Sequence, residues 1–76
     1  MILHYYAETD SLYIDLKEEP SCDSREVAPG IVLDFDGLGQ LVGIDIQNAS
    51  QNVNLSRLEA EELPIAKLLL TSTAGA

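Results

Sequence analysis

The chain has 76 residues and a net charge of −9, from 13 acidic and 4 basic side chains. Its length allows one small domain, and its 46% hydrophobic and 22% charged content is that of a folded globular protein rather than a disordered one. The excess of acids disfavours direct binding to nucleic acids or to anionic membrane surfaces, and no apolar run is long enough to span a bilayer.

The length and the cysteine content set two further expectations. A chain this short buries only a thin hydrophobic core, so we expect a homodimer or a small protein partner to add stability. Cys22 is the only cysteine, and the N-terminus lacks the basic and apolar regions of a signal peptide. Both features favour a location in the cytoplasm.

The N-terminal part of the sequence predicts a β-hairpin. Residues 2–6 are rich in β-forming side chains, and residues 11–17 alternate apolar and polar positions. A four-residue turn between these strands brings the apolar side chains of both to one face. The predicted pairs are Leu3 with Ile14 and Tyr5 with Leu12.

A second hairpin is predicted after a polar loop. Residues 30–36 and 40–46 form its strands, and Asp36-Gly37-Leu38-Gly39 suits a four-residue turn. In such a turn Asp36 accepts backbone N–H bonds and Gly39 tolerates a left-handed conformation. The predicted pairs are Leu33 with Val42 and Ile31 with Ile44.

The two hairpins share one apolar face. Gly43 interrupts the last strand, which indicates a bulge or a close approach by another part of the backbone. Residues 25–28 are a candidate for a short additional extended piece before Pro29. The predicted core positions are Leu3, Tyr5, Leu12, Ile14, Leu16, Ile31, Leu33, Phe35, Val42, Ile44 and Ile46.

The C-terminal part predicts helical structure. Residues 47–50 suit the start of a short helical turn, and a capping box of Ser56 and Glu59 predicts a helix over residues 57–63. The apolar residues 65–70 pack either on the sheet or against another copy of the chain. These patterns leave the two arrangements open.

Together these elements predict one small α+β domain over residues 1–70, followed by a flexible tail at residues 71–76. The domain is an antiparallel β-meander of about four strands in two hairpins. One or two short C-terminal helices pack on one face of that sheet.

Several short motifs run in a fixed order through both hairpins. They are Asp10-Ser11-Leu12-Tyr13-Ile14, Glu26-Val27-Ala28-Pro29-Gly30, Leu33-Asp34-Phe35-Asp36, Gly39, Val42-Gly43-Ile44-Asp45-Ile46 and Ala49-Ser50. Through these motifs, residues 5–50 resemble a family of small prokaryotic proteins known as domain of unknown function 2283. The sequence departs from the family at Tyr6, where an acid is usual, so no role of that acid is carried over.

The resemblance implies a compact β-sheet domain with a C-terminal helix, in the bacterial cytoplasm. It implies no activity, because the family has none assigned. Proteins of this kind often lie beside genes for small toxins, which makes an antitoxin-like inhibitor of a basic neighbouring protein one alternative function.

Three aspartates are the candidates for a metal site. Asp34, Asp36 and Asp45 stand at the first, third and twelfth positions of a partial calcium loop. Leu38 at the fifth position offers no side-chain oxygen, and the flanking segments are strands, so a hairpin turn is the favoured interpretation. A second arrangement would join His4 to outer-face carboxylates, and a plain surface role is favoured for that histidine.

No catalytic residue or cofactor is predicted. Asp23 beside Cys22 disfavours a reactive thiolate, and His4 has no patterned partner for nucleophilic catalysis. The outer face of the sheet mixes apolar and aromatic side chains with acids, which suits protein binding as well as it suits a solvated face. The partner-binding candidates are Tyr6, Tyr13, Asp15, Asp34, Leu41 and Asp45.

The preferred function is therefore a non-catalytic module that self-associates or binds a protein. One alternative is a metal-dependent or acid–base enzyme that uses the outer-face carboxylates, and a second is the antitoxin-like inhibitor. The sequence favours a protein that is not an enzyme.

Overall fold

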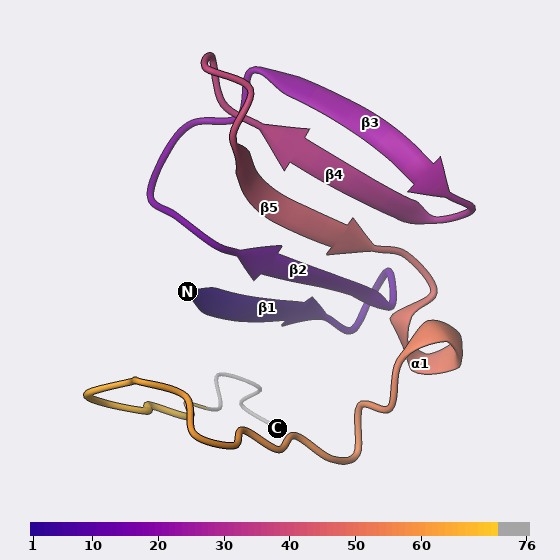
Figure 1. Ribbon diagram of the computed structural model, residues 1–76. Coiled ribbons are helices and arrows are strands. Elements are labelled where there is room, and N and C mark those ends of the chain that lie inside the picture. The colour runs from indigo at the N-terminus through magenta and orange to yellow at the C-terminus, as the bar shows by residue number, and fades with distance from the viewer. Residues whose placement is uncertain (72–76) are drawn as a thin grey trace.

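The computed structural model describes residues 1–71 and consists of one antiparallel sheet with a short helix (Figure 1). Five strands stand side by side in the order β1-β2-β5-β4-β3. The elements are β1 (Ile2–Tyr6), β2 (Ser11–Asp15), β3 (Asp23–Ala28), β4 (Ile31–Phe35), β5 (Leu41–Ile46) and α1 (Ala49–Asn52). The small α+β class is confirmed, and the predicted count of four strands is wrong by one.

The first hairpin has the predicted register. Leu3 pairs with Ile14 and Tyr5 pairs with Leu12, so the apolar positions of β1 and β2 share one face. The turn between the strands is closed by backbone bonds from Thr9 to Tyr6 and from Asp10 to Ala7. The alternation and the loop length therefore fixed this register together.

The fifth strand is β3, which sequence reasoning treated only as a short extended piece. It pairs with β4 through a tight turn at Pro29-Gly30, in which Gly30 has a φ of 79°. A register shift lies between Glu26 and Ala28. Since β3 is an exposed edge strand, no face of it is selected for apolar residues, and its sequence lacks the alternation that marks β2.

The second hairpin is shifted by two residues from the predicted register. Leu33 pairs with Ile44 rather than Val42, and Ile31 pairs with Ile46. One residue of the shift arises because the Asp36 N–H donates to the Gln40 carbonyl, which closes a three-residue loop. The other arises from a bulge opposite Phe35. A shift of two keeps the side chains of residues 31–34 and 43–46 on their predicted faces.

The sheet consequently has two unlike sides. The apolar side carries Leu3, Tyr5, Leu12, Ile14, Ile31, Leu33, Phe35, Ile44 and Ile46. The polar side carries His4, Tyr6, Tyr13, Asp15, Ser24, Glu26, Val32, Asp34, Gly43 and Asp45. Register partners point to the same side, so this division follows from the pairing alone.

The helix is found at Ala49–Asn52, and the predicted helix over residues 57–63 is absent from the described chain. A short turn near residues 47–50 was anticipated, and it is confirmed. The Ser56 hydroxyl donates to the Asn54 side chain instead of capping a helix. A capping box supplies only local preference, and seven residues without a packed face are too few to hold a helix in water.

Residues 54–71 are exposed throughout. Leu68, Leu69 and Leu70 are 65%, 70% and 76% exposed, so this segment does not cover the sheet in the described structure. Of the predicted tail at residues 71–76, residues 72–76 lie outside the described residues.

The buried core is small and lies at one end of the apolar side. Leu12, Ile46 and Ala49 form its centre, and Ile14, Ile31, Ile44 and Val53 pack against it. Val42 is also buried, whereas the predicted core residues Leu3 and Tyr5 are 46% and 48% exposed. The helix α1 packs at this end, whereas the buried Val42 lies toward the other end of β5.

Candidate functional site

The polar side of the sheet is organised around one side chain that crosses a neighbouring strand. Tyr13 on β2 passes over Gly43 on β5, and its hydroxyl donates a 2.9 Å hydrogen bond to Asp34 Oδ2 on β4. A Cβ atom on Gly43 would lie 1.9 Å from the Tyr13 hydroxyl oxygen. Because Gly43 has no side chain, Tyr13 lies over it and reaches Asp34. The predicted close approach to Gly43 therefore comes from a side chain and not from backbone.

Asp34 also accepts a second hydroxyl bond. The Ser24 Oγ on β3 donates to Asp34 Oδ1 at 2.6 Å, so both carboxylate oxygens have donors within the sheet. Four of the five strands are linked by this chain of contacts from Tyr13 to Ser24. The contacts give Asp34 a structural role in holding β2, β5, β4 and β3 together.

The electrostatics of this cluster keep the phenol neutral. Burial raises the pKa of Tyr13 to about 12, with further contributions from its bond to Asp34 and from the charges of Asp34, Asp15 and Asp45. A phenol with so high a pKa does not serve as a base near neutral pH. The arrangement supports packing and alignment of strands rather than proton transfer.

A second polar cluster fastens α1 to the first hairpin. Asp10 accepts the Ala49 N–H on its backbone oxygen at 2.8 Å, and its carboxylate accepts the hydroxyl of Ser50 at 2.7 Å. Tyr5 Oη also donates to Asp10 Oδ1 at 2.8 Å. The bonds from Ser50 and then from Tyr5 hold the pKa of the Asp10 carboxyl below its ordinary value.

The three candidate metal ligands occupy different settings. Asp36 lies in the hairpin turn, where its Oδ1 accepts the N–H groups of Leu38 and Gln40, each at 2.9 Å. Asp34 is bound to Tyr13, and Asp45 is the register partner of Tyr13 on β5. Among residues 1–71, no three His, Cys, Asp or Glu side chains are arranged to hold a metal ion.

The remaining predicted groups are scattered. His4 stacks on Tyr6 with ring centroids 6.3 Å apart, and its register partner is Tyr13. Cys22 is exposed in the loop before β3. The structure therefore does not bring His4 into a cluster of carboxylates.

The partner-binding candidates also lie in different parts of the sheet. Tyr6 is 53% exposed on the edge of the polar side. Asp15 and Asp45 are half-buried around Tyr13, which together with Asp34 belongs to the cross-strand cluster. Leu41 pairs with Phe35 and so belongs to the apolar side, because the bulge in β5 changes the face it occupies.

The apolar side is the surface that sequence reasoning missed. It was assigned to the core, yet in the structure its residues are unevenly buried. Leu12, Val42 and Ile46 are buried and the apolar residues of β4 are half-buried, whereas Leu3 and Tyr5 on β1 are exposed. α1 and Val53 pack at the end near Leu12 and Ile46. Within the strands, the only charged residues on this side are Asp23 and Arg25, on the edge strand β3. Arg25 lies over the Phe35 ring, 4.7 Å from its centroid, and so bounds the apolar side at that edge.

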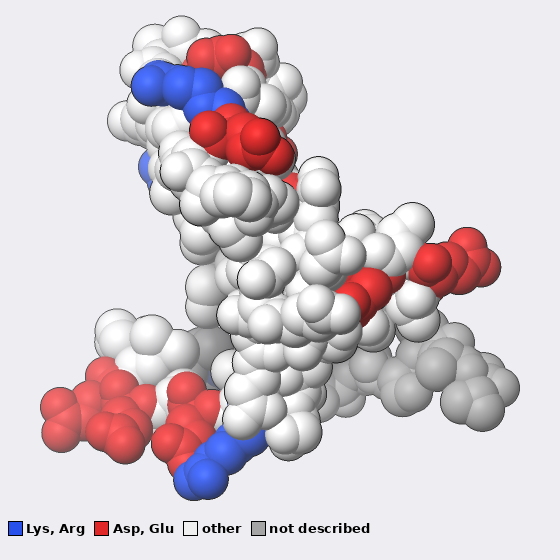
Figure 2. Space-filling view, turned by 90° about the vertical axis from the view of Figure 1, so that its right-hand side faces the viewer, with Lys and Arg blue, Asp and Glu red and all other residues white. Residues whose placement is uncertain are grey.

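Charged side chains lie mainly at the margins of the molecule. Seen from the end at which α1 lies, the middle of the surface is uncharged, and most Lys, Arg, Asp and Glu residues stand toward its extremities (Figure 2). The end of the molecule at which α1 lies therefore carries few charged side chains near its middle (Figure 2).

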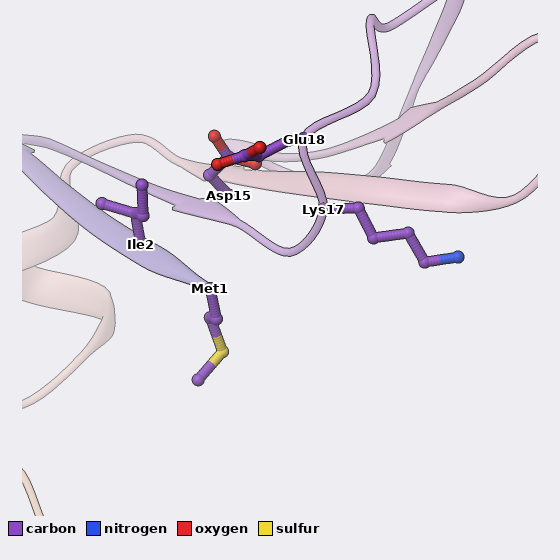
Figure 3. A pocket seen from close by; sticks show the side chains of 5 residues that line it. All are labelled: Met1, Ile2, Asp15, Lys17 and Glu18. Carbon is purple, nitrogen blue, oxygen red and sulfur yellow. The ribbon is translucent and has the colours of Figure 1, made fainter. Parts of the chain in front are cut away.

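The hollows of the surface do not resemble a substrate site. One of about 40 Å³ is lined by Met1, Ile2, Asp15, Lys17 and Glu18, and Met1 and Lys17 point away from the two carboxylates (Figure 3). That volume is far below the roughly 300–1,000 Å³ of small-molecule pockets. A wider, open depression of about 390 Å³ is lined only by consecutive residues of the first turn, Tyr5 to Thr9.

Comparison with known proteins agrees with the resemblance found in the sequence. Residues 2–50 match the model of a family described as "Protein of unknown function (DUF2283)". No curated protein and no solved structure matched the chain. Within residues 1–71, none of the helical structure has the length and apolar character that crossing a membrane requires. Since the family model covers well over half of the sequence, the chain belongs to the DUF2283 family.

Proposed function

We propose that the protein is a non-catalytic module that self-associates or binds a small protein, and that the apolar side of the sheet is its contact surface. The observation that carries the proposal is the absence of a second layer over this side in residues 1–71. Four hydrophobic residues are buried there, whereas exposed large hydrophobic residues occur along β1 and throughout residues 55–70. An apolar surface of this kind marks an interaction site more often than a solvated face.

The size of the apolar side supports the same conclusion. Five strands about 4.8 Å apart and about 17 Å long give the whole side an area on the order of 400 Å² in projection, of which α1 covers one end. Contiguous apolar patches of about 300–600 Å² on small proteins are often functional. Covering the patch would also supply burial that a domain of this length cannot obtain alone.

The polar residues support a role without chemistry. Several residues of the family motifs make hydrogen bonds that stabilise the fold. Asp10 binds Ser50, Tyr13 binds Asp34, and Asp36 closes a turn. Each of these groups is engaged in hydrogen bonds inside the domain. A site for proton transfer or metal binding would need such groups directed at a common point.

The charge favours a protein partner over a nucleic acid. Of the four basic side chains, Arg25 covers Phe35 and Arg57 pairs with Glu59, and the chain as a whole is at −9. Phosphate backbones require clustered Lys and Arg. We place the module in the bacterial cytoplasm, as its family resemblance and its single cysteine suggest, and as a homodimer or bound to a small protein.

Size-exclusion chromatography with light scattering tests the proposal. We expect a molar mass well above the monomer value of 8.2 kDa at high protein concentration, or a co-purifying protein of defined stoichiometry. A strict monomer over a wide concentration range, with no protein held in common between preparations from the native host, would overturn it.

A further inference from the structure

The two edges of the sheet differ in how they are protected. β1 and β3 are the outermost strands, and every residue of both is exposed. An edge strand presents unpaired N–H and C=O groups, which another strand can bind. Among residues 1–71, no backbone hydrogen bond from the C-terminal segment 54–71 reaches β1. Both edges thus offer backbone groups for pairing.

β3 carries the features that prevent such pairing. It contains Asp23, Arg25 and Glu26, its register is broken between Glu26 and Ala28, and Pro29 follows it directly. Charges, bulges and prolines are the common means by which edge strands avoid a partner. β1, Ile-Leu-His-Tyr-Tyr, has none of these features.

The distribution of charge singles out the strand at which a second copy meets the least repulsion. A second copy of a chain with net charge −9 is repelled at long range, so its approach is least unfavourable where acids are absent. β2, β3, β4 and β5 each carry an Asp or Glu, and β1 alone carries no Asp, Glu, Lys or Arg. The edge that lacks protection is therefore also the strand at which two copies meet with the least repulsion.

We propose that two copies of this chain join through β1, paired antiparallel about a two-fold axis at His4. In this register Leu3 lies opposite Tyr5 of the second copy on the apolar side, and Ile2 lies opposite Tyr6 of the second copy on the polar side. Aliphatic–aromatic pairs of this kind stabilise antiparallel strands. The strand is thus complementary to itself over all five residues.

The pairing continues the contact surface of the module. An antiparallel edge pair keeps equivalent sides of the two sheets together, so the apolar sides of both copies form one surface on a ten-stranded sheet. The inference rests on the proposed function, because it adds a second contact, at the β1 edge, to association through the apolar side. It also explains why Leu3 and Tyr5, predicted to lie in the core, are half exposed in the single chain.

Disulfide trapping tests this pairing. In a Cys22→Ser background, His4→Cys places two thiols opposite each other, with Cβ atoms about 4.5–5.5 Å apart, a separation close to that of a disulfide. Glu26→Cys, on the polar side of the other edge strand, is the matched control. With oxidised glutathione we expect a covalent dimer from His4→Cys, and at least about tenfold less from Glu26→Cys, because only the first pair is held at high effective concentration.

The outcomes separate this inference from the proposed function. Equal trapping at both positions, or a protein that associates in solution without trapping at His4→Cys, overturns the β1 pairing and leaves the proposed function standing. A protein that is monomeric at every concentration and is trapped at neither position overturns both. In that last case, the alternative is that residues 65–70 of the same chain fold back and pair with β1.

Discussion

Individual residues in this domain have roles that depend on their neighbours across the sheet. Gly43 has the backbone of an ordinary strand residue and is needed because Tyr13 lies over it. Tyr13 in turn connects β2 with Asp34 on β4. A glycine in a strand was a visible signal for a close approach, but its partner depends on a diagonal contact that follows only from the exact register.

Replacing Gly43 tests this contact. We expect Gly43→Ala to lower the free energy of unfolding by about 1–3 kcal/mol, because the new Cβ displaces the Tyr13 ring and breaks its bond to Asp34. In a Tyr13→Ser background the same substitution should be neutral or stabilising, since Ala is otherwise preferred to Gly in a strand. Urea denaturation of the native protein, the two single variants and the double variant measures the coupling free energy between Gly43 and Tyr13. Additive effects of the two substitutions would contradict this role of Gly43.

The raised pKa of Tyr13 predicts a loss of stability in alkali. The neutral phenol is the native form, so its contribution is complete below the unfolded pKa of 10.0 and is lost as the pH rises toward the folded pKa of about 12. Urea denaturation across this pH window should show a steeper decline for the native sequence than for Tyr13→Phe. The pKa of Tyr5 is also raised, mainly by its bond to Asp10, but Tyr5 is present in both proteins and its effect cancels. Equal slopes would show that Tyr13 titrates normally.

The elements show where sequence patterns determine structure and where they do not. The register of the first hairpin was predicted correctly because alternation and loop length specify the same pairing, although β2 ends at Asp15 rather than at residue 17. The second kept its faces but not its register, since one bulge and one shorter turn move the strands by two residues together. β3 and the region of residues 57–63 were mistaken because neither packs against a face of the sheet, so no periodicity is imposed on them.

The candidate site could be predicted only in part, for the same reason. The polar side was assigned correctly from alternation, except for Leu41, which the bulge places opposite Phe35. The exposed apolar side could not be foreseen, because apolar alternation has the same form whether or not a second layer covers it. Its exposure depends on the helix that residues 57–63 do not form.

The conformation of the turn between β4 and β5 can be tested by substituting its two glycines. Gly39 has a φ of 79° with open space around it, so Gly39→Ala should cost about 1–2 kcal/mol from backbone strain alone. Gly37 is in the same loop without a positive φ, and a Cβ there would meet Cys22 Sγ at an ordinary 3.7 Å. Gly37→Ala is thus the matched control and should be neutral or slightly stabilising. Thermal denaturation that ranks the two alike would contradict the proposed turn geometry.

The whole molecule is a single sheet. Hydrogen bonds between side chains connect the strands on its polar side, and α1 packs at one end of its apolar side. The hydrogen bonds on the polar side connect the strands of this small domain in a defined register. We propose that its apolar side binds a second copy or a small protein. The acidic side chains repel a second copy or an acidic partner. This repulsion is weakest at β1, which carries no charged side chain.

The most direct test of the contact surface compares two substitutions on neighbouring residues of β4. Leu33 faces the apolar side and Val32 the polar side, and both are half-buried. By sedimentation velocity, with folding verified by circular dichroism, Leu33→Thr should weaken association through the apolar side by about tenfold or more, which corresponds to about 1.4 kcal/mol. Val32→Thr should leave it unchanged. Equal effects of the two substitutions, or no effect of Leu33→Thr, would contradict the assignment of the apolar side as the contact surface.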